Sequence, residues 1–271
     1  MKLENFYNHL LVQEGLQDIT VVGYRKVLDK FFRENKHFNR KAVENYVAEM
    51  RKTKYSYSHI ANTCVALEKL GKYIRKPIKL GRPRKPKQII KNTLTEGEIA
   101  RILAAVKNKR EEAILAILIY TGIRNRELCR IKVGDMDFDN HLLRILDGKG
   151  SKDRIVYFSK ECAKILLNYL GEYKREDKQF LFATLVRGNQ YNGWALRKLV
   201  KVVSRRANVK KRVFPHLFRH SFACNLLGHG ANIMTIKELL GHESIQTTML
   251  YTHSTPQRVQ SEYAFYMPSF T

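Results

Sequence analysis

The sequence has few acidic residues, no long apolar run and no closely paired cysteines. Its 25 Asp and Glu are outnumbered by 50 Lys and Arg, which gives a formal net charge of +25. This excess implies a polyanionic partner, such as DNA, RNA or an anionic membrane surface. The longest apolar run, Ala113–Tyr120, is too short for a membrane-spanning helix, which needs about 20 residues.

The cysteines are scattered along the chain, at Cys64, Cys129, Cys162 and Cys224. Because none of them forms a C-x-x-C pair, we expect reduced thiols, as is usual in a cytosolic protein. The N-terminal stretch, which contains Lys2, Glu4 and Glu14, lacks the apolar core of a signal peptide. We therefore expect a cytoplasmic protein with access to DNA.

One pattern is similar to a set of metal ligands. His216, His220 and Cys224 share a helix face at spacings i, i+4 and i+8. A zinc site usually has a fourth group or an open water position as well. Helix packing and the phosphate chemistry described below explain these residues better, so we expect neither a metal site nor a cofactor.

Residues 1–74 predict a bundle of four short amphipathic helices, and so a mainly α domain. Apolar residues recur at helical spacing, for example at Tyr24, Leu28 and Phe31. The expected helices are Lys2–Glu14, Thr20–Glu34, Arg40–Arg51 and Ser56–Ile74.

The composition changes over residues 75–92. From Arg75 to Lys91 the sequence contains eight Lys or Arg, three Pro, one Gly and no acid. Such a segment cannot bury a core, so we expect an extended linker between two domains. Its charge also suits contacts to a DNA backbone, and the two roles are compatible. The candidate phosphate contacts are Lys76, Arg82, Arg84, Lys85 and Lys87.

Residues 93–271 predict a second, mostly helical domain with one small antiparallel sheet. It begins with a capping box, in which Thr95 is the N-cap and Glu98 follows three residues later. Short strands are expected at Asp135–Phe138, His141–Leu146 and Arg154–Phe158, the last two flanking a Gly-rich hairpin tip. The expected helices run from Thr95 to Val106, over Arg110–Tyr120, from about Arg126, and over Lys160–Tyr173, Asn192–Arg206, Pro215–Leu227, Ile233–Leu240 and Ser244–Tyr251.

Tyr251, near the end of this domain, occurs together with the arginines and histidines that a tyrosine nucleophile would need. Tyrosine has a pKa near 10, so attack on a phosphodiester requires a cationic surround and an acid/base group. Arg124 and Arg219 could bind the non-bridging oxygens of the transition state, since guanidiniums stay charged at any working pH. His216 lies one helical turn before Arg219, and Tyr251 lies nine residues after His242.

These residues stand in three boxes and a hairpin motif that together resemble the tyrosine recombinases, or phage-integrase family, and most closely its compact Xer-type members. The first box is Thr-Gly-x-Arg-x-x-Glu-Leu, at Thr121–Leu128. The second is His-x-x-Arg-His, at His216–His220, and the third is Leu-Gly-His followed by the tyrosine, from Leu240 to Tyr251. The hairpin motif is Gly-Lys-Gly-x-Lys-x-Arg, at Gly148–Arg154. No single box is specific, but all four occur in order.

The resemblance implies a role for each residue. Tyr251 would attack the scissile phosphate and form a 3′-phosphotyrosyl bond, with His216 as proton acceptor and His242 hydrogen-bonded to the phosphate. Lys149 would be the general acid for the leaving 5′ oxygen, with Lys152 as the second choice. No ATP or metal would be needed. The N-terminal bundle would be a SAM-like core-binding domain on double-stranded DNA.

The resemblance also implies an assembly. Residues 252–271 are rich in aromatic side chains, and family members often dock such a tail into a neighbouring protomer, within a tetramer on two DNA sites. The alternative is a tail that packs on its own domain. Two other functions stay open: a type IB topoisomerase-like nicking-closing enzyme, and a DNA-binding protein of the same fold that has lost catalysis. The sequence does not decide between chromosome-dimer resolution, integration and excision, and inversion, although the lack of an extra N-terminal arm-binding domain slightly favours a simple Xer-like system over an integrase or excisionase role.

Overall fold

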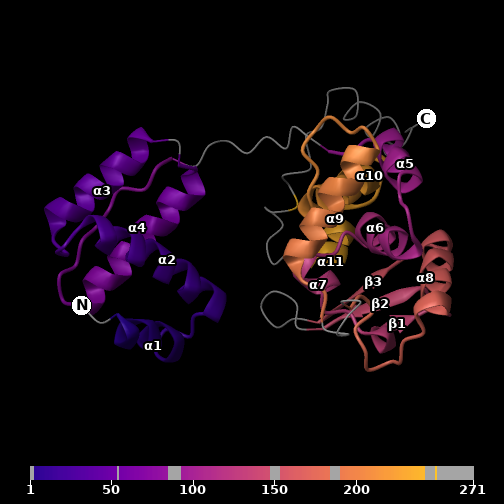
Figure 1. Cartoon of the computed structure of the whole chain (residues 1–271), viewed down its shortest axis with the longest axis horizontal. Coiled ribbons are helices and arrows are strands. Elements are labelled where there is room, and N and C mark those ends of the chain that lie inside the picture. Colours follow the sequence, from indigo (N-terminus) through magenta and orange to yellow (C-terminus); the bar gives the residue numbers. More distant parts are fainter. Residues whose placement is uncertain are drawn as a thin grey trace, which may run out of the picture. The chain divides into compact units, whose positions relative to one another are not determined.

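The computed structural model describes residues 3–53, 55–84, 93–146, 153–183, 190–241 and 248. The chain divides into two compact units, Met1–Lys87 and Gln88–Thr271 (Figure 1). The two strands flanking the hairpin pair in one small antiparallel sheet, and helices make up most of the rest. The prediction of a mainly helical fold with one small sheet is confirmed.

The first unit is a bundle of four helices. They are α1 (Glu4–Val12), α2 (Asp18–Glu34), α3 (Arg40–Lys52) and α4 (Tyr57–Tyr73). All four were expected, and their ends differ from the prediction by no more than a few residues. The apolar faces meet in one core, in which Phe6, Leu28, Phe31, Leu67 and Leu70 are buried. The helical spacing of these residues therefore explains why α4 packs against both α2 and α3.

The beginning of the basic segment packs on this bundle, and here the expectation of a segment without buried side chains is wrong. Ile78 and Leu80 are buried and belong to the core of the first unit. The chain passes so close to Gly71 that a Cβ there would lie 2.8 Å from the carbonyl oxygen of Lys76. Two apolar side chains at alternate positions are enough to hold the segment, although it is basic overall. Lys85 and Lys87 lie outside the described residues.

The second unit contains seven described helices, a 3-10 turn and three strands (Figure 1). The elements before the sheet are α5 (Glu96–Ala104), α6 (Lys109–Thr121), α7 (Asn125–Leu128) and η1 (Val133–Asp135). The strands are β1 (Met136–Asp137), β2 (Leu142–Ile145) and β3 (Arg154–Tyr157). They are followed by α8 (Lys160–Tyr173), α9 (Gly193–Arg206), α10 (Pro215–Gly228) and α11 (Ile233–Leu240).

Local signals fix most of the helix starts in this unit. The capping box of Thr95 and Glu98 is present, with both reciprocal hydrogen bonds. The side chains of Asn108, Ser159 and Asn192 cap α6, α8 and α9 by accepting hydrogen bonds from backbone N–H groups of the first turn. The helix expected from Arg126 is only the single turn α7, and the helix expected over Ser244–Tyr251 is not among the described elements.

The sheet has the order β1-β2-β3, and both pairs are antiparallel. Leu143 pairs with Val156 and both are buried, whereas Arg144 pairs with Ile155 and both are exposed. One face of the sheet therefore lies on the core and the other on the surface, as expected for alternating strands. Residues 147–152, which join β2 to β3 and carry Lys149 and Lys152, lie outside the described residues.

Helix α6 lies at the centre of the second unit, and Figure 1 shows it between α8 and α10. The stretch Ala113–Leu118 has no exposed surface, so this part of the helix is apolar on every side, as a buried helical segment must be. Its C-terminal end leads directly to Gly122 and Arg124. The first candidate arginine is thus placed by the most deeply buried helix of the unit.

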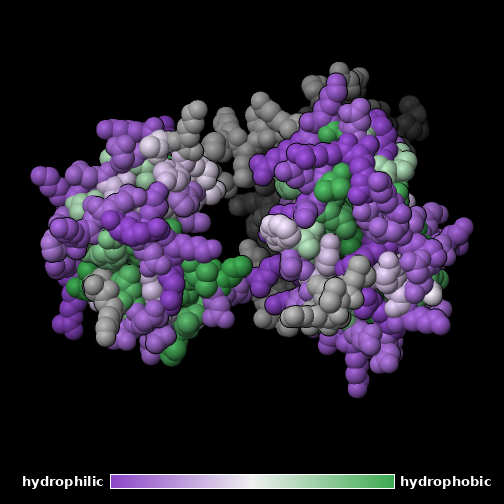
Figure 2. All heavy atoms as spheres, viewed as in Figure 1, coloured by the Kyte–Doolittle hydropathy of each residue, from purple (hydrophilic) through white to green (hydrophobic). Residues whose placement is uncertain are grey.

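The outer surfaces are polar. Figure 2 shows hydrophilic side chains over most of the visible face of each unit. Within the described parts of the chain, no helix is both long enough and apolar enough to cross a membrane.

Replacement of Leu115 by Ala should destabilise the second unit by about 2–5 kcal/mol, because this side chain has no exposed surface and its loss leaves a cavity in the core. The matched control is Leu167→Ala on α8, where the leucine is 52% exposed and should contribute within about 0.5 kcal/mol. Urea unfolding followed by circular dichroism measures both. Equal losses for the two variants would contradict the assignment of α6 to the core.

Candidate active site

Three of the six expected catalytic residues are described by the structure, and they lie in the second unit. Arg124 is the N-cap residue of α7, and His216 and Arg219 lie on α10. Lys149, His242 and Tyr251 lie outside the described residues, and so does Lys152. The structure therefore tests the environment of the two arginines and of His216.

Arg219 is a buried arginine held by the carbonyl ends of two helices. It is 4% exposed. Its Nη1 donates to the carbonyl of Gly122, just beyond α6, at 2.9 Å, and its Nη2 donates to the carbonyl of Leu240, the last residue of α11, at 2.5 Å. The last carbonyls of a helix have no partner within the helix and carry partial negative charge. They are therefore suitable acceptors for a buried guanidinium.

Arg124 is held in a similar way but is more accessible, with 21% of its side chain exposed. Its Nη2 donates to the carbonyl of Gly241 at 3.0 Å, and its Nη1 donates to Oε1 of Glu127 at 2.9 Å. Because Leu240 and Gly241 are consecutive, the end of α11 brings the two guanidiniums together. This end lies immediately before His242, the first residue of the segment that leads to Tyr251.

Two glycines make this arrangement possible. Gly122 and Gly241 follow α6 and α11 in the left-handed conformation, with φ of +59° and +61°. A Cβ on Gly122 would collide with the ring of Phe222, and one on Gly241 would lie 2.8 Å from Cδ of Arg154. Only glycine fits both the backbone conformation and the space.

Glu127 lies behind Arg124 as a shared acceptor. Its side chain is 6% exposed, and its Oε2 also accepts from the backbone N–H of Arg124 at 2.7 Å. Burial raises the pKa of Glu127, but hydrogen bonds and charge from Arg154, with further hydrogen bonds from Arg124, outweigh burial and lower the pKa to about 2. The carboxylate is therefore charged at any working pH and orients Arg124.

Arg154 also belongs to this site, although the sequence motifs alone assigned no role to it. It donates from Nη1 and Nη2 to the two oxygens of Glu127, at 2.8 Å each. The signal was present, because Arg154 is the last position of the motif at Gly148–Arg154. Its partner lies 27 residues earlier in the chain, and no local spacing indicates such a pair.

The imidazole of His216 is set to be neutral. His216 has exposed surface, but the surrounding protein partly desolvates the ring, and this lowers its pKa below 6.5. The positive charges of Arg219 and Arg124 lower the pKa further, and Glu127 opposes them. A neutral imidazole beside two guanidiniums can accept a proton while the arginines bind an anion. The site is thus suited to a phosphate ester whose transition state gains negative charge.

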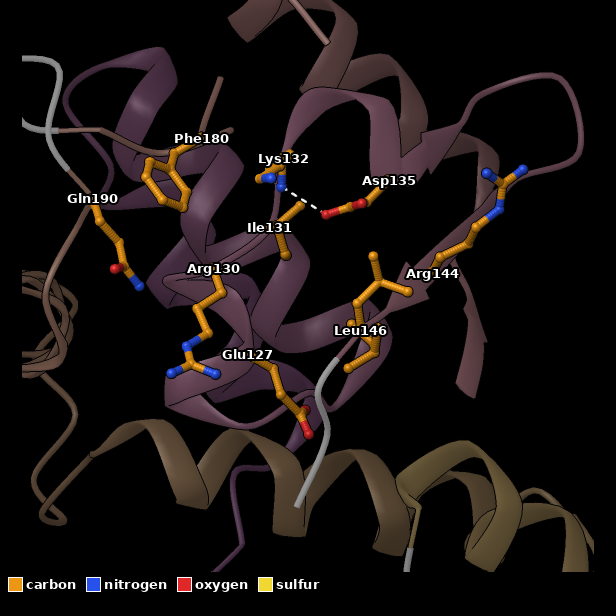
Figure 3. Close-up of a pocket in the computed structure, with 10 residues that line it drawn as sticks. Glu127, Arg130, Ile131, Lys132, Asp135, Arg144, Leu146, Phe180 and Gln190 are labelled. Atoms are coloured by element: carbon orange, nitrogen blue, oxygen red, sulfur yellow. Dashed lines mark hydrogen bonds between the residues drawn. The ribbon is translucent and has the colours of Figure 1, made fainter. Parts of the chain in front are cut away.

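Glu127 also borders a surface pocket of about 370 Å³ (Figure 3). In Figure 3, Glu127 and Arg130 lie at one end of the pocket, while Lys132 and Asp135 lie at the other. There the backbone N–H of Lys132 donates to the carboxylate of Asp135 at 2.8 Å. The pocket is open to solvent, and both acidic and basic side chains line it. It adjoins the site of the two arginines through Glu127.

The remaining candidates are not assembled with this site by the described residues. Lys76, Arg82 and Arg84 belong to the first unit and are exposed. Arg82 forms an ion pair with Glu68 at 2.9 Å, which anchors the basic segment to α4. The described residues contain no group of three or more His, Cys, Asp and Glu side chains that could hold a metal ion, and His216, His220 and Cys224 are among the residues searched.

Comparison with known proteins agrees with these features. Residues 92–258 match the model of the phage integrase family. Tyrosine recombinase XerA of Pyrococcus horikoshii is 32% identical, over 95% of this chain and 90% of that protein. A tyrosine recombinase of Pseudothermotoga lettingae is 30% identical, over 94% of each chain.

Solved structures give the same result. A crystal structure of a XerA recombinase matches with a TM-score of 0.59 and 29% identity, over 98% of both chains. The site-specific recombinase XerH, bound to its difH substrate in a pre-cleavage complex, matches with a TM-score of 0.75 and 21% identity, over 98% of this chain and 84% of that one. The second likeness concerns the fold alone.

Nuclear magnetic resonance should show His216 titrating below 6.5, with Arg219→Gln raising its pKa without restoring the ordinary value, because desolvation remains. A lowered folded-state pKa means that the unfolded chain binds more protons just below pH 6.5. His216 should therefore contribute stability that is lost as pH falls from about 6.5 towards its folded pKa. His59, exposed on α4, is the control ring. A His216 pKa above 6.5 would contradict the neutral proton acceptor.

Proposed function

The chain belongs to the phage integrase family of tyrosine recombinases, enzymes that cleave and rejoin DNA, and we propose that it performs site-specific strand exchange with Tyr251 as its nucleophile. The observation that supports this assignment is the convergence of Arg124 and Arg219 on the carbonyls of Gly241 and Leu240. Those carbonyls directly precede His242 and the segment that carries Tyr251. This attachment supports the proposal, because the segment with the nucleophile begins at the residue after Gly241.

The proposed reaction exchanges one ester bond for another. The phenolic oxygen of Tyr251 attacks the scissile phosphorus, and its proton passes to neutral His216. The bond from phosphorus to the 5′ oxygen breaks, and Lys149 protonates that oxygen. The products are a 3′-phosphotyrosyl bond and a free 5′-hydroxyl. Attack by a 5′-hydroxyl from another strand reverses the steps and completes the exchange.

Arg124 and Arg219 stabilise the charge that develops on the non-bridging oxygens, and His242 donates a hydrogen bond to the phosphate. Because both guanidiniums are fixed by helix ends before the substrate arrives, they need little reorganisation during the reaction. The phosphotyrosyl bond conserves the energy of the phosphodiester, so the reaction does not consume ATP. The fixed cations take the part that a divalent ion plays in many nucleases.

The proposal includes the DNA, the location and the assembly. Solved relatives bind DNA, as XerH does in the complex with its difH substrate. We propose that this protein acts in the cytoplasm on double-stranded DNA.

Residues 1–74 act as a core-binding domain, residues 75–92 as a basic linker and residues 93–271 as the catalytic domain. Phosphate contacts come from Lys76, Arg82, Arg84, Lys85, Lys87 and Lys152. Four protomers join two sites, with residues 252–271 docked in trans.

Replacement of Tyr251 by Phe removes only the attacking oxygen and should abolish the covalent adduct with DNA, while DNA affinity stays within a few-fold. Incubation with fragmented DNA of the source genome, followed by denaturing electrophoresis, detects the adduct, and sequencing the trapped fragment identifies the site. Tyr157→Phe is the control, since Tyr157 is 59% exposed on β3 and should still allow trapping. An adduct with the Tyr251→Phe variant would identify another nucleophile. Wild-type binding without any adduct would indicate a non-catalytic DNA-binding protein.

Deletion of the residues after Thr255 tests the assembly. Binding to a single site and formation of the adduct should survive, since the proposed catalytic residues all precede the deletion. Pairing of two sites and strand exchange should be lost. Gel mobility measures binding and pairing, and a plasmid with two sites measures exchange. A truncated protein that recombines at the normal rate would mean that the tail packs on its own domain. A full-length protein that relaxes plasmids without strand exchange would instead favour the topoisomerase-like activity.

A further inference from the structure

Arg154 has no role in the reaction described above. Its guanidinium nevertheless donates a hydrogen bond from each of its three nitrogens. Nη1 and Nη2 donate to Glu127 at 2.8 Å each, and Nε donates to the carbonyl of Leu239 at 3.2 Å. Only 11% of the side chain is exposed. Three of its five N–H groups are thus directed at protein acceptors, and the side chain is nearly buried. These contacts lie with the groups around Arg124, so the effect of Arg154 on the reaction acts through its partners.

Those partners place Arg154 where three parts of the site meet. Glu127 belongs to α7, behind Arg124, and Leu239 belongs to the last turn of α11. Arg154 itself begins β3, immediately after the hairpin segment that carries Lys149. Its aliphatic stem fills the space beside Gly241, whose carbonyl holds Arg124. The residue is thus in contact with the groups that orient Arg124 but not with the substrate.

The contact between Arg154 and Glu127 also changes the net charge beside Arg124. Glu127 carries one negative charge, and two guanidiniums share it. The buried group of Arg124, Glu127 and Arg154 therefore has a net positive charge. Without Arg154, the carboxylate would have Arg124 as its only cationic partner, and the pair would be neutral. An opposite charge in close contact cancels the field that Arg124 directs at a phosphate.

We propose that Arg154 is a positioning residue that balances the charge of Glu127, so that this carboxylate orients Arg124 without neutralising it towards the scissile phosphate. The inference rests on the proposed function, because it assumes that Arg124 stabilises the transition state. It assigns to the base of the hairpin a task separate from that of Lys149. The site then uses two arginines on the phosphate and a third one behind them.

Single-turnover cleavage at saturating protein tests the inference. The substrate is a nicked duplex with the sequence recovered by covalent trapping. Arg154→Gln should cleave about 10²-fold more slowly, the scale of losing one preorganised donor, with DNA affinity within a few-fold. Arg154→Lys should lose less, since it keeps the charge. Arg144→Gln is the matched control, because Arg144 is an exposed arginine on the adjacent strand.

A second substitution separates charge balance from simple packing. In Arg154→Gln/Glu127→Gln, the amide oxygen can still accept from Arg124, but the unbalanced negative charge is gone. This double variant should cleave at least about tenfold faster than Arg154→Gln alone, a non-additive result that reports direct coupling. If the double variant is as slow as Arg154→Gln or slower, the side chain serves only the packing of this region and the proposal is wrong.

A 5′-bridging phosphorothiolate distinguishes the route through Arg124 from one through the hairpin lysine. Sulfur leaves without a proton, so this substrate should restore Lys149→Ala and leave Arg154→Gln slow. Restoration of Arg154→Gln would overturn the inference. Thermal unfolding identifies a variant that does not fold, in which case Arg154→Lys and the double variant decide. Wild-type protein without an adduct refutes the proposed function, whereas active wild type with an equally active Arg154→Gln refutes the inference alone.

Discussion

The burial of positive charge is the constraint on which the catalytic unit depends. A guanidinium removed from water needs acceptors for its donors, and here the backbone supplies them at the ends of two helices. Gly122, just beyond α6, and Leu240, at the end of α11, accept from Arg219, while Gly241 accepts from Arg124. Because α6 is the most deeply buried helix of the unit, the hydrophobic core sets the position of the Gly122 carbonyl. The apolar sequence of α6 is therefore a condition for the charged site beside it.

A single carboxylate links this backbone arrangement to the sheet. Glu127 binds the main chain and side chain of Arg124 and the side chain of Arg154. A buried carboxylate is stable only with full compensation, and this one has more positive than negative charge around it, which is why its pKa falls to about 2. The excess positive charge is what an anion-binding site requires. Packing, hydrogen bonding and electrostatics of this region are thus set by the same few contacts.

The sequence predicted those parts of the fold that depend on short-range patterns. The capping box at Thr95 and Glu98 and the helical spacing of Tyr24, Leu28 and Phe31 are local, and the structure has both. The sequence motifs also selected Arg124, His216 and Arg219, and the structure brings these three residues into one region, because the order of motifs along the chain substitutes for three-dimensional proximity. Arg154 was not singled out, since its pairing with Glu127 depends on how the sheet meets α7. Ile78 and Leu80 were missed because an average composition hides two well-placed apolar side chains.

The end of α11 binds two arginines through carbonyls of consecutive residues, so one short backbone segment fixes both guanidiniums. A shift of this backbone segment by a fraction of a hydrogen-bond length would weaken the bond of Leu240 to Arg219 and that of Gly241 to Arg124 together. A displacement of α11 would therefore disturb the position of both guanidiniums at once, and a substitution that moves one of these two carbonyls also moves the acceptor of the other arginine.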